Sequence, residues 1–166
     1  MKKLAKLLLQ LAALGLLALA FLLYQMSQIR PGEMEADHPD IGMVASVLSG
    51  ASLELTDSFQ MSGNWSGDID RGFAARVADF DWQSLSRVNA YRGDQLPGNL
   101  ASATEFAVNN LGQGRQSWFP SAAEIMTERY FVYGLNIEPG DHHADSAQML
   151  FLRPEDGMVF YSWVKF

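Results

Sequence analysis

An uncharged, apolar run near the amino terminus constrains this chain more than any other feature. The run extends from Leu7 to Tyr24 and is interrupted only by Gln10 and Gly15. At about 1.5 Å per helical residue it spans roughly 27 Å, which is close to the thickness of the hydrocarbon core of a bilayer. We therefore predict a single membrane-spanning helix within residues 1–25, with residues 7–24 in contact with lipid.

The charges on either side of the run predict its orientation. Three lysines precede it, whereas the polar stretch that follows carries one arginine and then four acidic residues before position 41. Positive charge favours the cytoplasmic side of a membrane. We expect a single-pass protein of the cell membrane whose amino terminus is cytoplasmic and whose remaining chain is periplasmic or extracellular.

A secretory signal peptide is the alternative for the same segment. Ala18-Leu19-Ala20 has the small-x-small form that signal peptidases prefer, although Phe21 to Tyr24 continue the apolar run beyond it. The sequence favours a retained anchor or uncleaved signal over cleavage after Ala20. Either alternative exports the rest of the chain.

Composition excludes several kinds of site and partner. The chain has no cysteine, so disulfides and thiolate metal sites are excluded. All 19 acidic residues but only eight of the 12 basic residues follow Pro31, which gives 8 − 19 = −11 with neutral histidines. Nucleic acids bind through clusters of Lys and Arg, so we expect no nucleic-acid partner.

Turn-forming residues and periodic apolar residues divide the remaining chain. Residues 26–40 are polar and contain two prolines, which is typical of a juxtamembrane linker. No second linker follows, so we expect one exported domain over residues 41–166. Within it the patterns predict helices at 41–48, 100–111 and 122–128, and strands at 53–61, 73–82, 87–91, 130–137, 148–153 and 158–166.

Several residues are expected to fix the ends of these elements. Asp40 is a candidate cap for the first helix, and Ser102 and Glu105 have the spacing of a capping box in the second. Ser121 and Glu124 repeat that spacing before the third helix. Gly157 suits the left-handed position of a turn between the last two strands.

Tight turns between consecutive strands predict how the strands pair. Short connections join antiparallel neighbours, whereas parallel strands need a long crossover. We therefore predict an α+β fold, in which two or three helices pack on one face of a mostly antiparallel sheet.

The segment from Asp141 to Asp145 is a candidate metal site, although the sequence supports it only weakly. It offers Asp141, His142, His143 and Asp145, whose side chains are suitable zinc ligands. Adjacent residues on an extended chain point to opposite sides, so a solvated hairpin loop is the favoured interpretation. We expect no cofactor.

Aromatic residues are the more suggestive feature. Tyr161 and Trp163 have the same parity on one predicted strand, so their rings point to one face. Together with rings on the neighbouring strand they can form a surface for a peptide or a glycan; the alternative is that all of these rings fill the core. The candidate surface consists of Trp118, Tyr130, Tyr133, Tyr161 and Trp163.

No catalytic motif stands out, and no serine lies in a Gly-x-Ser-x-Gly elbow. The sequence therefore favours a non-catalytic, membrane-anchored envelope protein, an accessory or assembly factor whose exported domain binds a protein partner. The alternative is an exported small hydrolase or ligand-binding protein, which would use an aromatic-lined pocket or the loop from Asp141 to Asp145. The sequence does not identify a small-molecule ligand.

Overall fold

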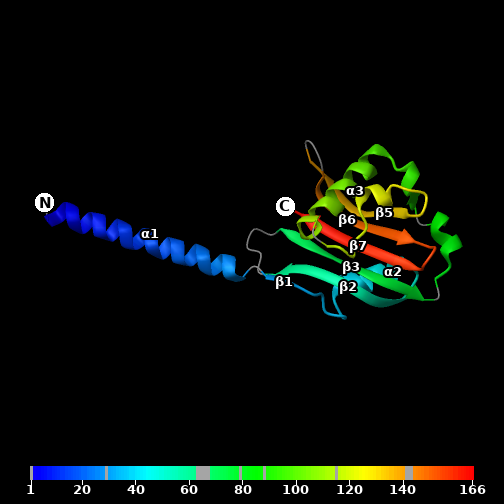
Figure 1. Cartoon of the computed structure of the whole chain (residues 1–166), viewed down its shortest axis with the longest axis horizontal. Helices are drawn as coiled ribbons and strands as arrows, with labels where there is room; N and C mark the ends of the chain where they lie inside the picture. Colours follow the sequence, from blue (N-terminus) through cyan, green and yellow to red (C-terminus); the bar gives the residue numbers. More distant parts are fainter. Residues whose placement is uncertain are drawn as a thin grey trace.

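The computed structural model consists of a long amino-terminal helix and an α+β domain (Figure 1). It describes residues 2–28, 30–62, 68–78, 80–87, 89–114, 116–140 and 144–166. The helix, α1 (Lys2–Gln28), extends away from the domain.

The described side chains of α1 run from Gln10 to Tyr24, and all of them are exposed. Within the described residues, no helix is both long and apolar enough to cross a membrane. The transmembrane helix expected within residues 1–25 therefore stays a prediction.

The domain is built on one seven-stranded sheet in which every pair of neighbours is antiparallel. The predicted α+β class and antiparallel sheet are thus confirmed. The strand order is β1-β2-β3-β7-β6-β5-β4. The strands are β1 (Arg30–Gly32), β2 (Ser52–Ser62), β3 (Ile69–Ala78), β4 (Tyr91–Arg92), β5 (Phe131–Pro139), β6 (Ala144–Arg153) and β7 (Met158–Lys165).

Three further helices and three short 3₁₀ segments connect these strands. Helices lie close to each predicted position, although the third is shorter than expected. They are α2 (Pro39–Val47), α3 (Gly98–Asn110), α4 (Ala122–Ile125), η1 (Trp82–Arg87), η2 (Gly93–Gln95) and η3 (Leu111–Gly114).

Two of the expected helix caps are wrong, and one is confirmed. His38, not Asp40, caps α2, because its Nδ1 accepts a hydrogen bond from the Asp40 amide at 3.2 Å. α3 starts behind Pro97 with no side-chain cap, so Ser102 and Glu105 lie inside the helix. Ser121 caps α4 as expected, accepting a hydrogen bond from the Glu124 amide.

The expectation that all helices pack on one face is wrong. α3, α4 and η3 cover one face of the sheet, and α2 covers the other (Figure 1). Successive residues of β7 alternate between the two cores: Val159 and Tyr161 pack beneath α2, whereas Phe160 packs beneath α3. A sheet with apolar residues on both faces needs cover on both.

A bulge interrupts the pairing of β2 with β3. Leu55 pairs with Ala75 and Asp57 pairs with Ala74, so Thr56 is an extra residue. The bulge changes the face to which alternate side chains point. The alternation of apolar residues from Leu53 to Met61 predicts one buried face for this strand. That prediction is wrong, because Leu55 packs on the α2 side and Phe59 packs on the α3 side.

Several predicted boundaries also differ from the structure. The strand predicted at 73–82 is β3, which ends at Ala78, and the strand predicted at 148–153 begins already at Ala144. Instead of a strand over 87–91, β4 holds only Tyr91 and Arg92, and residues 82–87 form η1. Part of the expected linker forms β1, and Met34 is buried in the core beside it. The hairpin of β6 and β7 is confirmed, with Gly157 at φ +69° in its turn.

Candidate functional site

The structure does not assemble the five predicted aromatic residues into one surface. Tyr130 and Tyr161 are fully buried, so they belong to the core and cannot line an exposed face. Tyr133 and Trp163 are half-buried on the α2 side, whereas Trp118 packs on the α3 side. The five rings are therefore divided between the two faces of the sheet. The alternative prediction, that these rings fill the core, is correct for Tyr130 and Tyr161.

The candidate metal residues are only partly described. Asp141, His142 and His143 lie outside the described residues, and Asp145 is exposed at the start of β6. Among the described residues there is no group of three His, Asp or Glu side chains that could hold a metal ion.

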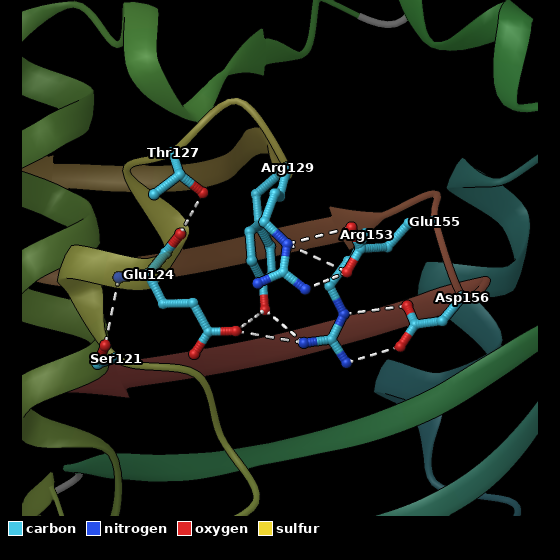
Figure 2. A network of polar contacts seen from close by, with 8 residues as sticks. Ser121, Glu124, Thr127, Arg129, Arg153, Glu155 and Asp156 are labelled. Atoms are coloured by element: carbon cyan, nitrogen blue, oxygen red, sulfur yellow. Dashed lines mark hydrogen bonds and ion pairs between the residues drawn. The ribbon is translucent and has the colours of Figure 1, made fainter.

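Tyr130 lies at the centre of a polar network where α4 meets the hairpin of β6 and β7. Its hydroxyl donates to Glu124 at 2.8 Å and accepts from Arg153 at 2.7 Å. Figure 2 shows Arg153 between Glu124 and Asp156, with Arg129 bound to Glu155 nearby. The network ties α4 to the end of the sheet.

The electrostatics of this network argue for a structural role. Burial, together with the hydrogen bond to Glu124, raises the pKa of Tyr130 well above its usual value. The pKa of Arg153 is raised as well, chiefly by its hydrogen bond to Asp156. A phenol that stays protonated beside a cation that stays charged is a poor general base at neutral pH.

A second polar network is buried beneath α2. Arg71 binds the Asp40 carboxylate through two nitrogens, at 2.7 and 3.3 Å, and stacks over the Trp163 ring. The Tyr161 hydroxyl donates to the same carboxylate at 2.8 Å and accepts from Gln148. Burial and the nearby Asp40 charge raise the pKa of Tyr161. The network fixes α2 on the sheet, because Asp40 lies in the first turn of that helix.

Among the described residues, the outer edge of β5 combines unpaired backbone with an adjoining groove. β4 pairs with β5 only at Phe131 and Val132, and within the described residues no strand pairs with the outer side of β5 from position 133 to 139. The Gly93 amide donates to the Tyr130 carbonyl at 2.9 Å. In an antiparallel ladder every second residue directs its backbone N–H and C=O groups to the same side of the strand. Tyr130 and Gly134 are four residues apart, so the backbone groups of Gly134 point outward as well.

A groove lies where the chain before β4 separates from β5. Its volume is about 380 Å³, and Leu100 of α3 and Ile137 of β5 contribute apolar surface to it. Tyr91 is 47% exposed at this groove, the largest exposure of any bulky apolar side chain outside α1 and the terminal Phe166 in the described chain. None of the described lining residues is charged; they are Asn89, Tyr91, Pro97, Asn99, Leu100, Tyr133, Gly134 and Ile137.

The opposite edge of the sheet is partly covered by the chain itself. β1 pairs with β2 at Gln60 to Ser62. The segment after β1 continues along β2, because the Gln60 side chain donates to the Glu33 carbonyl and the Met34 amide donates to the Ser58 hydroxyl. A pocket of about 400 Å³ beside this segment includes Trp118. The two edges therefore differ within the described residues: the groove beside β5 is uncharged, whereas the pocket beside β2 is lined in part by Glu33 and Asp57.

Of the groove residues, Tyr133 alone was predicted from the sequence to lie in a binding surface. The signal that could have indicated an edge was Gly134 within the strand predicted at 130–137 together with Pro139 just after it, because both residue types are unfavourable in central strands.

Comparison with known proteins gives no further constraint, since no protein-family model, no curated protein and no solved structure matches this chain.

Proposed function

We propose that this chain is a non-catalytic, membrane-anchored envelope protein whose α+β domain binds a partner protein at the open edge of β5. The observation that carries the proposal is the uncharged groove of about 380 Å³ beside unpaired backbone, with the exposed ring of Tyr91 at its side. Tyrosine supplies a large, rigid contact area together with a polar hydroxyl, and it is enriched at protein interfaces.

The properties of α1 support the anchoring part of the proposal. Its described large apolar side chains are all at least 50% exposed, and they are Leu11, Leu14, Leu16, Leu17, Leu19, Phe21, Leu22, Leu23 and Tyr24. Apolar patches of this kind mark contact with protein or membrane. The lysines at its start and the acidic chain beyond it favour an exported domain.

The chemistry of the groove favours binding over hydrolysis. Its described lining contains no carboxylate, imidazole or lysine, the groups that most often act as general acids and bases. The two buried tyrosines that have polar partners are held protonated by burial, which leaves them without a base's function at neutral pH.

Site-specific photocrosslinking in intact membranes tests the proposal. We would replace Tyr91 with the photoreactive residue p-benzoylphenylalanine, and use the same replacement at the exposed Glu54 of β2 as the control. The expected result is an adduct with one discrete protein from position 91 and not from position 54. No adduct, or the same adducts from both positions, would refute a specific partner at this edge.

A further inference from the structure

We propose that the partner binds as an added β-strand along β5, and that this strand is a basic, extended segment of a different protein. The inference rests on the proposed function and specifies its binding mode. Three features of the β5 edge support it: the unpaired backbone, the adjoining groove and the charges at its two ends.

The backbone of β5 offers hydrogen bonds that a loop or helix would use less well. Unpaired N–H and C=O groups on an edge strand are a template for another strand. Proteins commonly protect such edges with charged side chains, yet Gly134, Leu135, Asn136 and Ile137 carry no charge. Irregular register at Leu135 and at the end of the strand limits the open length to a few residues.

The groove provides a place for one apolar side chain of the added strand. Gly134 lacks a Cβ atom, and an atom there would lie 2.8 Å from Ile137 Cδ1 and 3.3 Å from Leu100 Cδ1. The glycine therefore lets two apolar side chains approach the backbone of the edge strand. Alternate residues of an added strand point to the same face, so every second residue of the segment would face this apolar surface.

Charge favours a basic segment. The ion pairs at the two ends of the edge contain the cations Arg92 and Lys165 and three carboxylates, those of Asp94, Glu128 and Glu138, which leaves a local charge of 2 − 3 = −1. The chain after Pro31 carries a net charge of −11. Acidic side chains on an incoming strand would be repelled, whereas Lys or Arg would be attracted.

A second copy of this chain fits the edge poorly. The register places Arg30, opposite Ser62, at the same end of the sheet as Glu138. Two β5 strands paired antiparallel would put the two chain entries at opposite ends of the strands. Along the strand direction alone, nine residues at 3.3 Å each separate the entries by roughly 30 Å. The α1 helices of the two copies would then leave the dimer at opposite ends, where they could not both readily enter one membrane. We therefore infer that the occupant is a different protein.

Defined peptides test this binding mode on the full chain in detergent micelles. The probe is a synthetic peptide that alternates valine and lysine. The comparisons are a valine–glutamate peptide, a peptide of the same composition with its lysines in one block, and the first peptide with alternate amides N-methylated. Fluorescence anisotropy gives the affinities, and NMR gives hydrogen exchange at the Gly134 amide, with the Tyr133 amide, which points toward β6, as the internal control.

We expect the alternating basic peptide to slow exchange at Gly134 and to leave Tyr133 unchanged. Each of the three comparison peptides should bind at least about tenfold more weakly. Ile137→Lys should weaken binding by a similar factor, whereas Ala36→Lys, an exposed site with the same change of charge, should have a small effect. Circular dichroism would verify that both variants fold.

Equal binding of the N-methylated peptide would overturn strand addition, and equal binding of the acidic peptide would overturn the basic class. If no peptide binds, the proposed strand is wrong as well. In each case an adduct at Tyr91 but not at Glu54 would leave the proposed function standing, so the two failures are distinguishable.

Discussion

Removal of the Asp40 carboxylate should destabilise the domain more than removal of any exposed carboxylate. Asp40 is 6% exposed and binds Arg71 through two nitrogens and Tyr161 through its hydroxyl. Breaking a buried ion pair by removing one partner costs about 3–5 kcal/mol. Because the Arg71 side chain is 25% exposed, water can hydrate it in part, and we lower the expected loss for Asp40→Ala to about 2–3 kcal/mol.

Urea denaturation of the full chain in detergent micelles, followed by tryptophan fluorescence, measures this loss. Asp94→Ala is the matched control, because Asp94 binds Arg92 on the surface with both side chains about 40% exposed; it should cost about 0–1 kcal/mol. The unfolding temperature of Asp40→Ala should fall by roughly 5–10 °C. A loss within 0.5 kcal/mol of the control, a margin of about the error expected for such comparisons, would refute the assignment of α2 docking to this network.

Three other expectations concern alkaline pH, a close backbone contact and a turn. Burial raises the pKa values of Tyr130 and Tyr161 above the usual value of 10. Above pH 10 the unfolded chain therefore loses protons that the native state keeps, and the free energy of unfolding should fall. Between pH 8 and pH 11, urea titrations should show a smaller fall for Tyr161→Phe than for the unchanged protein, and an equal fall would contradict the role given to burial. Gly93→Ala should disrupt the packing of η2 against the end of α4, because a Cβ there would overlap the carbonyl oxygens of Ile125 and Thr127. The variant should show a lowered unfolding temperature, whereas Gly98→Ala, where a Cβ meets nothing within 4 Å, should not. Gly157→Ala should cost about 1 kcal/mol in urea denaturation, because Gly157 has φ +69°; no loss would mean that the turn relaxes freely.

The pattern of the sequence was sufficient for the elements that repeat regularly. α3 and the hairpin of β6 and β7 follow from local periodicity and from the Pro-Glu-Asp-Gly turn. The burial of β6 on both faces was also visible in the run Ala147 to Leu152, which is apolar except for Gln148. That run is typical of a central strand and predicts cover on both faces, which the expectation of a one-sided sheet overlooked.

Features that depend on contacts between distant residues could not be read from the sequence. The bulge at Thr56 is defined by pairing with β3. Asp40, which was expected to cap α2, instead binds Arg71, 31 residues later in the chain. The open edge of β5 depends on the order of strands, in which β7 and β6 separate β3 from β5. Residue types indicate aromatic rings, but only the fold decides that Tyr161 is buried and that Tyr91 is exposed.

Thiol labelling in intact membranes tests the central claim that the exported domain uses the β5 edge for binding. The chain has no cysteine, so a single Asn136→Cys on β5 or Glu54→Cys on β2 reports on its own exposed position. With a maleimide that cannot cross the membrane, we expect both variants to react from outside the cytoplasm, and Asn136→Cys to react about tenfold more slowly in membranes than after purification, a ratio that would indicate occupancy of the edge. Equal rates for Asn136→Cys in membranes and in the purified protein, or no reaction of either variant from outside, would contradict the account.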